Sequence, residues 1–93
     1  MKVIIREEAV DDLDGIFAWV ARDDPAAALE LLRRIRERIE RLATPGLSHM
    51  GRFGMVAGTR ELVEAPYVIV YNVDEGRRQI VIVAVMHARR DRS

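Results

Sequence analysis

"GTRELVEAPYVIVYNVDEGRRQIVIVAVMHARRD", residues 58–91, is the stretch of sequence that decides the fold. It contains three apolar runs rich in Val, Ile and Tyr, the composition of strands with a buried face. The runs are Thr59–Val63, Tyr67–Val73 and Ile80–Met86. Ala65-Pro66 separates the first two, and proline cannot donate a hydrogen bond to a sheet ladder. Asp74-Glu75-Gly76 separates the last two with the glycine that hairpin turns favour, so we predict a three-stranded antiparallel meander.

Alternation along the strands predicts which side chains share a face. Tyr67, Ile69 and Tyr71 lie on one face of the second run. In the third run, one face is expected to hold Ile80, Ile82, Ala84 and Met86, and the other Gln79, Val81, Val83, Val85 and His87. Both faces are largely apolar, unlike those of a strand with one side in water. We expect helices on one face, and a loop, a second copy or a partner protein on the other.

The residues before this stretch predict a strand and a first helix. Lys2–Ile5 is a short apolar run, typical of a strand. A helix is expected to begin near Glu7 or Glu8, where acidic side chains favour a helix N-terminus, and to end by Arg22. Its apolar stripe has helical spacing and consists of Ala9, Leu13, Ile16 and Val20.

A second helix follows after a very short connection. Asp24-Pro25 supplies an N-cap and a proline at the first helical position, and the helix runs to about Ala43. Its stripe is Ala28, Leu32, Ile35, Ile39 and Leu42. Two adjacent helices with matching stripes predict an antiparallel hairpin that packs on the sheet. The expected fold class is α+β, in the order β-α-α-β-β-β, as one domain spanning residues 1–93.

Composition narrows the class of function. The 93 residues contain no cysteine and carry 15 basic and 15 acidic side chains, giving zero net charge. Proteins that grip nucleic acid through its phosphates usually have a basic excess, so we expect no direct sequence-specific nucleic-acid binding. No apolar run reaches the roughly 20 residues of a membrane span, and acidic residues near the N-terminus do not fit a signal peptide. We therefore expect a cytoplasmic protein that does not enter membranes.

Charge is distributed unevenly along the chain. Residues 7–24 are strongly acidic, whereas residues 77–92 are rich in arginine. Lys2 is the only lysine, and arginine is better suited than lysine to bidentate and stacked contacts at interfaces. Trp19 and Leu29 lie off the apolar stripes of their helices, by the roughly 100° per residue of an α-helix. They either pack at the edge of the sheet or form a docking surface for a partner.

Candidate catalytic groups are few. No cysteine nucleophile, Ser/His/Asp signature or HExxH motif is present, and we expect neither a metal site nor a cofactor. Asp11, Asp12 and Asp14 do not share one helix face and are expected to be solvated. Arg60 could join the sheet end that carries His87, Arg89 and Arg90. Such a cationic patch with an imidazole could bind phosphate or assist phosphodiester cleavage, or the arginines could simply pair with nearby acids.

The order of elements, with Gly-Thr-Arg-Glu-Leu at 58–62, Pro-Tyr-Val-Ile-Val-Tyr at 66–71 and His-Ala-Arg-Arg at 87–90, resembles the RelE/ParE family of bacterial toxins. The resemblance covers nearly the whole chain. It implies one of two activities. RelE-like members are ribosome-dependent ribonucleases that cut messenger RNA, whereas ParE-like members poison DNA gyrase. In both branches a cognate antitoxin from the same operon wraps the toxin with an extended or helical tail.

The motifs are closer to the ParE-like branch, and the zero net charge is unlike the strongly basic ribonucleases. The resemblance thus implies a toxin of a plasmid-stability system that inhibits DNA gyrase. Its antitoxin is expected to neutralise it in a complex of two toxins and two antitoxins or larger. Ribonuclease activity through Arg60, His87 and Arg89, or a non-toxic module that only binds an antitoxin, are the alternatives. The resemblance and the residues together predict partner-binding positions at Trp19, Leu29, Arg60, Tyr71, His87, Arg89 and Arg90.

Overall fold

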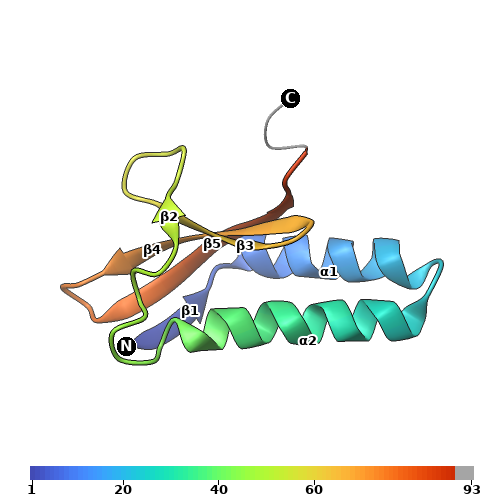
Figure 1. The fold of residues 1–93 in the computed structure, drawn as a ribbon, viewed down its shortest axis with the longest axis horizontal. Coiled ribbons are helices and arrows are strands. Elements are labelled where there is room, and N and C mark those ends of the chain that lie inside the picture. The colour runs from blue at the N-terminus through green and yellow to red at the C-terminus, as the bar shows by residue number, and fades with distance from the viewer. Residues whose placement is uncertain (90–93) are drawn as a thin grey trace.

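The protein, in a computed structural model that describes residues 1–89, consists of two helices packed on one face of a five-stranded sheet (Figure 1). The elements are β1 (Lys2–Ile5), α1 (Glu7–Ala21), α2 (Pro25–Arg41), β2 (Arg52–Phe53), β3 (Arg60–Glu64), β4 (Tyr67–Asp74) and β5 (Gln79–His87). The predicted α+β class and the helical hairpin are confirmed, and the meander is formed by β3, β4 and β5.

The strand order in the sheet is β1-β5-β4-β3-β2, with β1 parallel to β5 and every other pair antiparallel. The first and last strands of the chain, β1 and β5, are therefore neighbours, although both helices and three strands lie between them in the sequence. β2 is a fifth strand that the sequence did not predict. It pairs only Arg52 with Glu61 and Phe53 with Arg60, and two residues are too few for an alternating pattern to be visible.

The two helices lie antiparallel, with α1 against β5 and α2 near β3 (Figure 1). The Asp24 carboxylate accepts a hydrogen bond from the Ala27 N–H at 3.0 Å, and Pro25 follows as the first helical residue. This is the predicted cap, and such a cap contributes about 1 kcal/mol to helix stability. Within the part of the chain that the structure describes, neither helix is long and apolar enough to cross a bilayer.

The core lies between the helical hairpin and the sheet. Its largest fully buried side chains are Tyr71, Ile35, Leu42, Ile69, Ile80 and Ile82. They come from α2 and its C-terminal end and from the two central strands, so the helix stripe and one face of the meander close on each other. Arg38 joins the layers at the edge, because its guanidinium donates to the Val63 carbonyl at 3.0 Å.

A β-bulge in β5 changes which of its side chains meet the helices. Ile82 pairs with Tyr71 and Ala84 pairs with Val70, so Val83 is an extra residue between two consecutive pairs. The predicted alternation is therefore correct for Ile80 and Ile82 and wrong beyond the bulge. Val85 turns to the helix side, where it is buried, and His87 pairs with Tyr67 on that same side.

The sheet face away from the helices, on which the sequence predicted a loop, a second copy or a partner protein, has buried side chains at its centre. Val68 and Val70 lie on that face and are both buried. Their register partners there are Met86 and Ala84 on β5 and Val63 and Glu61 on β3. Val63 is the exposed large apolar side chain on this face, at 42%. The others of the described residues lie chiefly on the outer sides of the helices and in the segment around β2.

A candidate partner-binding groove

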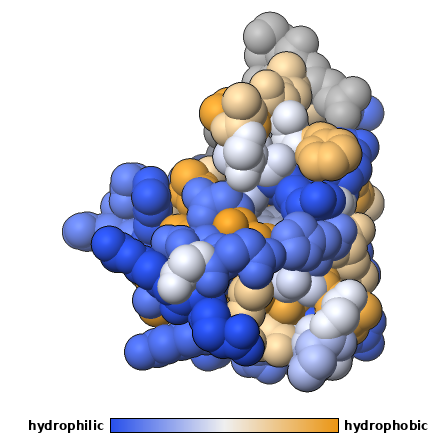
Figure 2. Space-filling model, turned by 90° about the vertical axis from the view of Figure 1, so that its left-hand side faces the viewer, coloured by the Kyte–Doolittle hydropathy of each residue, from blue (hydrophilic) through white to orange (hydrophobic). Residues whose placement is uncertain are grey.

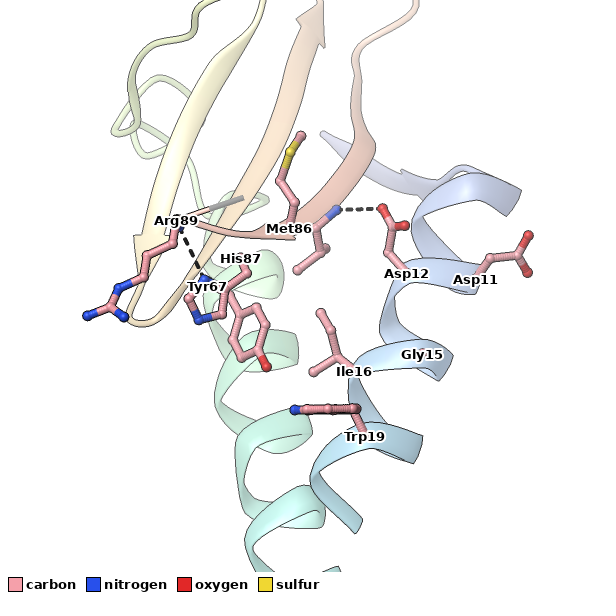
Figure 3. Close-up of a pocket in the computed structure, with 10 residues that line it drawn as sticks. Asp11, Asp12, Gly15, Ile16, Trp19, Tyr67, Met86, His87 and Arg89 are labelled. Carbon is pink, nitrogen blue, oxygen red and sulfur yellow. Dashed lines mark hydrogen bonds between the residues drawn. The ribbon is translucent and has the colours of Figure 1, made fainter. Parts of the chain in front are cut away.

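A groove of about 660 Å³ lies between α1 and the C-terminal end of β5 (Figure 3). One wall comes from α1 and the other from β5, with Tyr67 of β4 between them. The residues that line it are Asp11, Asp12, Gly15, Ile16, Trp19, Tyr67, Val85, Met86, His87 and Arg89. The groove thus combines an apolar and aromatic floor with carboxylates on the helix wall and an imidazole and a guanidinium on the strand wall.

The groove exists because β1 is shorter than β5. β1 ends at Ile5, and the next residue makes the last backbone contact, with the Arg6 N–H donating to the Ile82 carbonyl at 3.0 Å. Beyond that point α1 takes the place of a strand beside β5. The outer edge of β5 from Val83 to His87 therefore has no strand beside it, and such an edge can pair with another chain.

Asp12 covers part of this free edge. Its Oδ2 accepts a hydrogen bond from the Val85 N–H at 3.0 Å, as Figure 3 shows. The carboxylate supplies the acceptor that a neighbouring strand would otherwise provide. The expectation that all three aspartates of this helix are solvated is therefore wrong for Asp12, whereas Asp11 is exposed. The sequence could not separate them, because both are acidic residues in the same turn.

His87 lies at the strand wall in a defined orientation. Its ring meets the Tyr67 ring edge to face, with centroids 5.5 Å apart and an angle of 81° between the planes. Its Nδ1 accepts a hydrogen bond from the Arg89 N–H at 3.1 Å, so the proton of a neutral ring resides on Nε2. Arg89 is exposed at the rim, and Arg90, also predicted to contact a partner, lies outside the described residues.

Trp19 forms the far end of the groove floor. It is 65% exposed and lies below Ile16 in Figure 3, and the Arg22 guanidinium lies 5.3 Å from the centre of its ring. Trp19 lies off the apolar stripe of α1, as predicted, and its side chain is accessible to a partner. Gly15, one turn earlier, has no atom within 4 Å of the position that a Cβ would occupy. A helix-interior glycine costs about 1 kcal/mol relative to alanine, a sequence signal that could have indicated the groove.

Leu29 does not belong to this groove. It is 61% exposed on α2 and borders a separate, shallow depression of about 370 Å³ with Leu32, Arg33 and Arg36. Its predicted role in partner binding therefore concerns a different surface of the hairpin.

Tyr71 cannot contact a partner in this fold, because none of its surface is exposed. Its hydroxyl accepts a hydrogen bond from the Gly51 N–H at 3.0 Å, deep between the sheet and the segment before β2. A Cβ at Gly51 would lie 2.8 Å from that hydroxyl, so the close approach requires glycine. The prediction of Tyr71 as a partner-binding residue is corrected to a role in the core.

Arg60 is far from His87. Arg60 pairs with Tyr71 and His87 pairs with Tyr67, on opposite sides of β4 and four residues apart along it. At strand spacings this is about 13 Å along the sheet and about 10 Å across it. The Arg60 guanidinium is already engaged, since it donates to the His49 and Gly51 carbonyls and stacks on the Phe53 ring. The structure does not bring together the group predicted for phosphodiester cleavage.

Within residues 1–89, no group of three or more His, Asp or Glu side chains is placed to bind a metal ion. What the groove offers is recognition of a polypeptide. Free strand-edge groups of β5, a floor with Trp19 and Tyr67, and charges of both signs at the rim suit an extended or helical segment with apolar side chains. These contacts lie along β5, two strands away from Arg60 on β3.

Two helices on one face of a mixed five-stranded sheet are a fold that this chain shares with solved ParE- and RelE-type toxin–antitoxin proteins. A sequence model described as "ParE toxin of type II toxin-antitoxin system, parDE" matches residues 3–92. The chain is 42% identical over 82 residues to a protein of Sinorhizobium fredii (strain NBRC 101917 / NGR234) named "Putative toxin Y4kP", covering 86% of this chain and 80% of that protein. The chain therefore belongs to the ParE toxin family of type II toxin–antitoxin systems.

Solved structures agree with this assignment. A chain from the chromosomal ParDE TA system of P. aeruginosa superposes with a TM-score of 0.80 at 27% identity, covering 94% of this chain and 95% of that one. A chain of the RelBE2 toxin–antitoxin complex of Mycobacterium tuberculosis gives 0.64 at 22% identity, covering 92% and 95%. A chain of the E. coli RelBE complex gives 0.57 at 16% identity, covering 94% and 95%. The last two show the shared fold.

Proposed function

We propose that this ParE-family toxin inhibits DNA gyrase in the cytoplasm and is neutralised by a cognate antitoxin that occupies the α1–β5 groove. The proposed antitoxin site rests on one observation, the unpaired edge of β5 beside the exposed Trp19. An antitoxin segment can add backbone hydrogen bonds at that edge and place an apolar side chain against Trp19 and Tyr67. The similarity to a chain of a ParDE system supports a partner of this kind.

Gyrase rather than messenger RNA is the proposed target for two reasons. The family model is that of the ParE branch. In addition, the Arg60 and His87 pair that a ribonuclease would need is separated by β4, and Arg60 is engaged by backbone carbonyls. Transition-state stabilisation and proton transfer require both groups within reach of one phosphate, which this arrangement does not provide.

The target is tested by adding the purified chain to a gyrase supercoiling reaction and, separately, to translating ribosomes with messenger RNA. Loss of supercoiling with intact messenger RNA is the expected result. Cleavage of messenger RNA that disappears in both Arg60→Ala and His87→Ala, with gyrase unaffected, would show a ribonuclease instead.

The antitoxin site is tested by measuring the affinity of the antitoxin encoded beside the toxin. Trp19→Ala should weaken binding at least 30-fold, because a buried tryptophan anchor at an interface is typically worth 2 kcal/mol or more. Val10→Ala is the matched control, an exposed apolar residue of the same helix that does not line the groove. Equal affinities for wild type and Trp19→Ala would place the antitoxin elsewhere.

A further inference from the structure

Phe53, at the end of β2, and Met55 and Val56, on the segment that joins β2 to β3, form a projecting apolar tip. Their exposed fractions are 81%, 76% and 69%, above those of the other large apolar side chains in the described residues. Figure 1 shows the segment extending away from the sheet on the side opposite the helices. Figure 2, which views the molecule from the left-hand side of Figure 1, shows apolar side chains towards its upper end above a polar belt. Side chains this exposed contribute little burial energy to the folded chain.

The tip is held in place mainly by hydrogen bonds of its backbone and polar side chains, and of its three apolar side chains Phe53 also contacts the Arg60 guanidinium. The Gly54 N–H donates to the Thr59 carbonyl at 2.8 Å, and the Thr59 N–H and hydroxyl donate to the Val56 carbonyl at 3.1 and 2.6 Å. The Met55 N–H donates to Glu61 Oε2 at 3.3 Å, and Arg52 pairs with the same buried carboxylate. A preorganised loop loses little conformational freedom on binding, which favours a binding role for what it displays.

The base of the tip is positively charged. Residues 46–60 contain no Asp or Glu, and the one carboxylate that reaches the loop, Glu61, is buried and neutralised by Arg52. Arg60 contacts backbone carbonyls and the Phe53 ring, and within residues 1–89 no carboxylate lies within ion-pair distance of it. Both carbonyl hydrogen bonds come from Nη1, so the rest of the guanidinium, with its unneutralised charge, can meet an acidic group of a partner.

We infer that the tip inserts into an apolar cleft with a carboxylate at its rim on a folded target protein, and that this contact is separate from the antitoxin groove. A convex, rigid projection fits a concave surface, whereas an extended antitoxin tail fits a groove such as that beside α1. The strand order places β2 at the opposite edge of the sheet from β1, three strand spacings from β5. Under the proposed function, on which this inference rests for the identity of the target, the cleft belongs to gyrase.

The double substitution Met55→Ser, Val56→Ser tests the inference, because it removes apolar surface that the fold does not use. The gyrase concentration-inhibition curve should shift at least tenfold to higher toxin concentration, and growth arrest on induction in bacteria should weaken. The urea midpoint and the antitoxin affinity should match those of wild type. Val10→Ser, the same change at an exposed valine of α1, should leave inhibition at the wild-type level.

Several outcomes overturn the inference. Wild-type inhibition and growth arrest by the folded double variant show that the tip contacts no target. A loss of antitoxin affinity assigns the tip to the antitoxin, and a wild-type dimer that becomes monomeric in the variant assigns it to a second copy of the chain. If wild type arrests growth without inhibiting gyrase, the proposed function is wrong. Loss of that arrest in the double variant, with antitoxin affinity intact, then still supports a target-binding tip.

Discussion

Asp11 and Asp12 are adjacent carboxylates with different surroundings, and they allow the groove wall to be probed one residue at a time. Asp12 accepts the Val85 N–H, whereas Asp11 is exposed and is directed away from β5 in Figure 3. Asp12→Ala leaves a half-buried N–H without its acceptor, so the free energy of unfolding should fall by about 1–2 kcal/mol. Asp11→Ala should change it by less than about 0.5 kcal/mol.

Amide hydrogen exchange at Val85 measures the local effect of the Asp12→Ala and Asp11→Ala substitutions. The Val85 amide should exchange faster in Asp12→Ala at pH 7 and at the wild-type rate in Asp11→Ala, because only the first change removes its acceptor. Equal exchange rates in the two variants would show that the carboxylate does not protect the strand edge. At the residue scale the position of Trp19 off its stripe left edge packing and a docking surface both open, and the structure shows the side chain exposed. The sequence could not predict the role of Asp12, since the acceptor and its donor are 73 positions apart.

The bulge in β5 decides which residues of that element contribute to the core and to the groove. In an unbroken strand Val83 and Val85 would be equivalent, being two positions apart on one face. In the structure Val85 is buried against the helices, whereas Val83 is the extra residue and only half-buried. Val85→Ala should therefore lower the free energy of unfolding by about 2 kcal/mol, for two lost methyl groups and the cavity left behind.

Val83→Ala is the matched control and should cost clearly less than Val85→Ala, measured as the difference in urea midpoint at an unchanged m-value. Equal costs would argue for regular pairing without a bulge.

The order of the elements was predictable because most helices and strands are long enough to show their hydrophobic period, which differs between the two. The bulge was not, because Ile-Val-Ile-Val-Ala-Val is apolar at every position, so a one-residue shift leaves no mark in the pattern. The strand β2 was not predicted either, because its two residues are too few to show an alternating pattern.

The whole molecule displays more apolar surface than its fold requires. Trp19 in the groove, Leu29 on α2 and the apolar tip lie on three separate surfaces. At pH 7 the formal net charge is zero and the sequence pI is about 6.7, so charge repulsion between copies is weak. Weak repulsion combined with exposed apolar side chains favours association, and covering one of these surfaces should reduce it.

We therefore expect the isolated toxin to self-associate near neutral pH and the antitoxin complex to remain dispersed. Static light scattering at increasing concentration measures this directly. Trp19→Ser should reduce scattering of the free chain but not of the complex, because the antitoxin is proposed to cover that side chain. Below the pI the chain gains positive charge, so scattering of the free toxin should be weaker at pH 5 than at pH 7. A free toxin that stays monomeric at pH 7 would mean that these surfaces are too small or too dispersed to associate, and that the partner is required for inhibition of toxicity rather than for solubility.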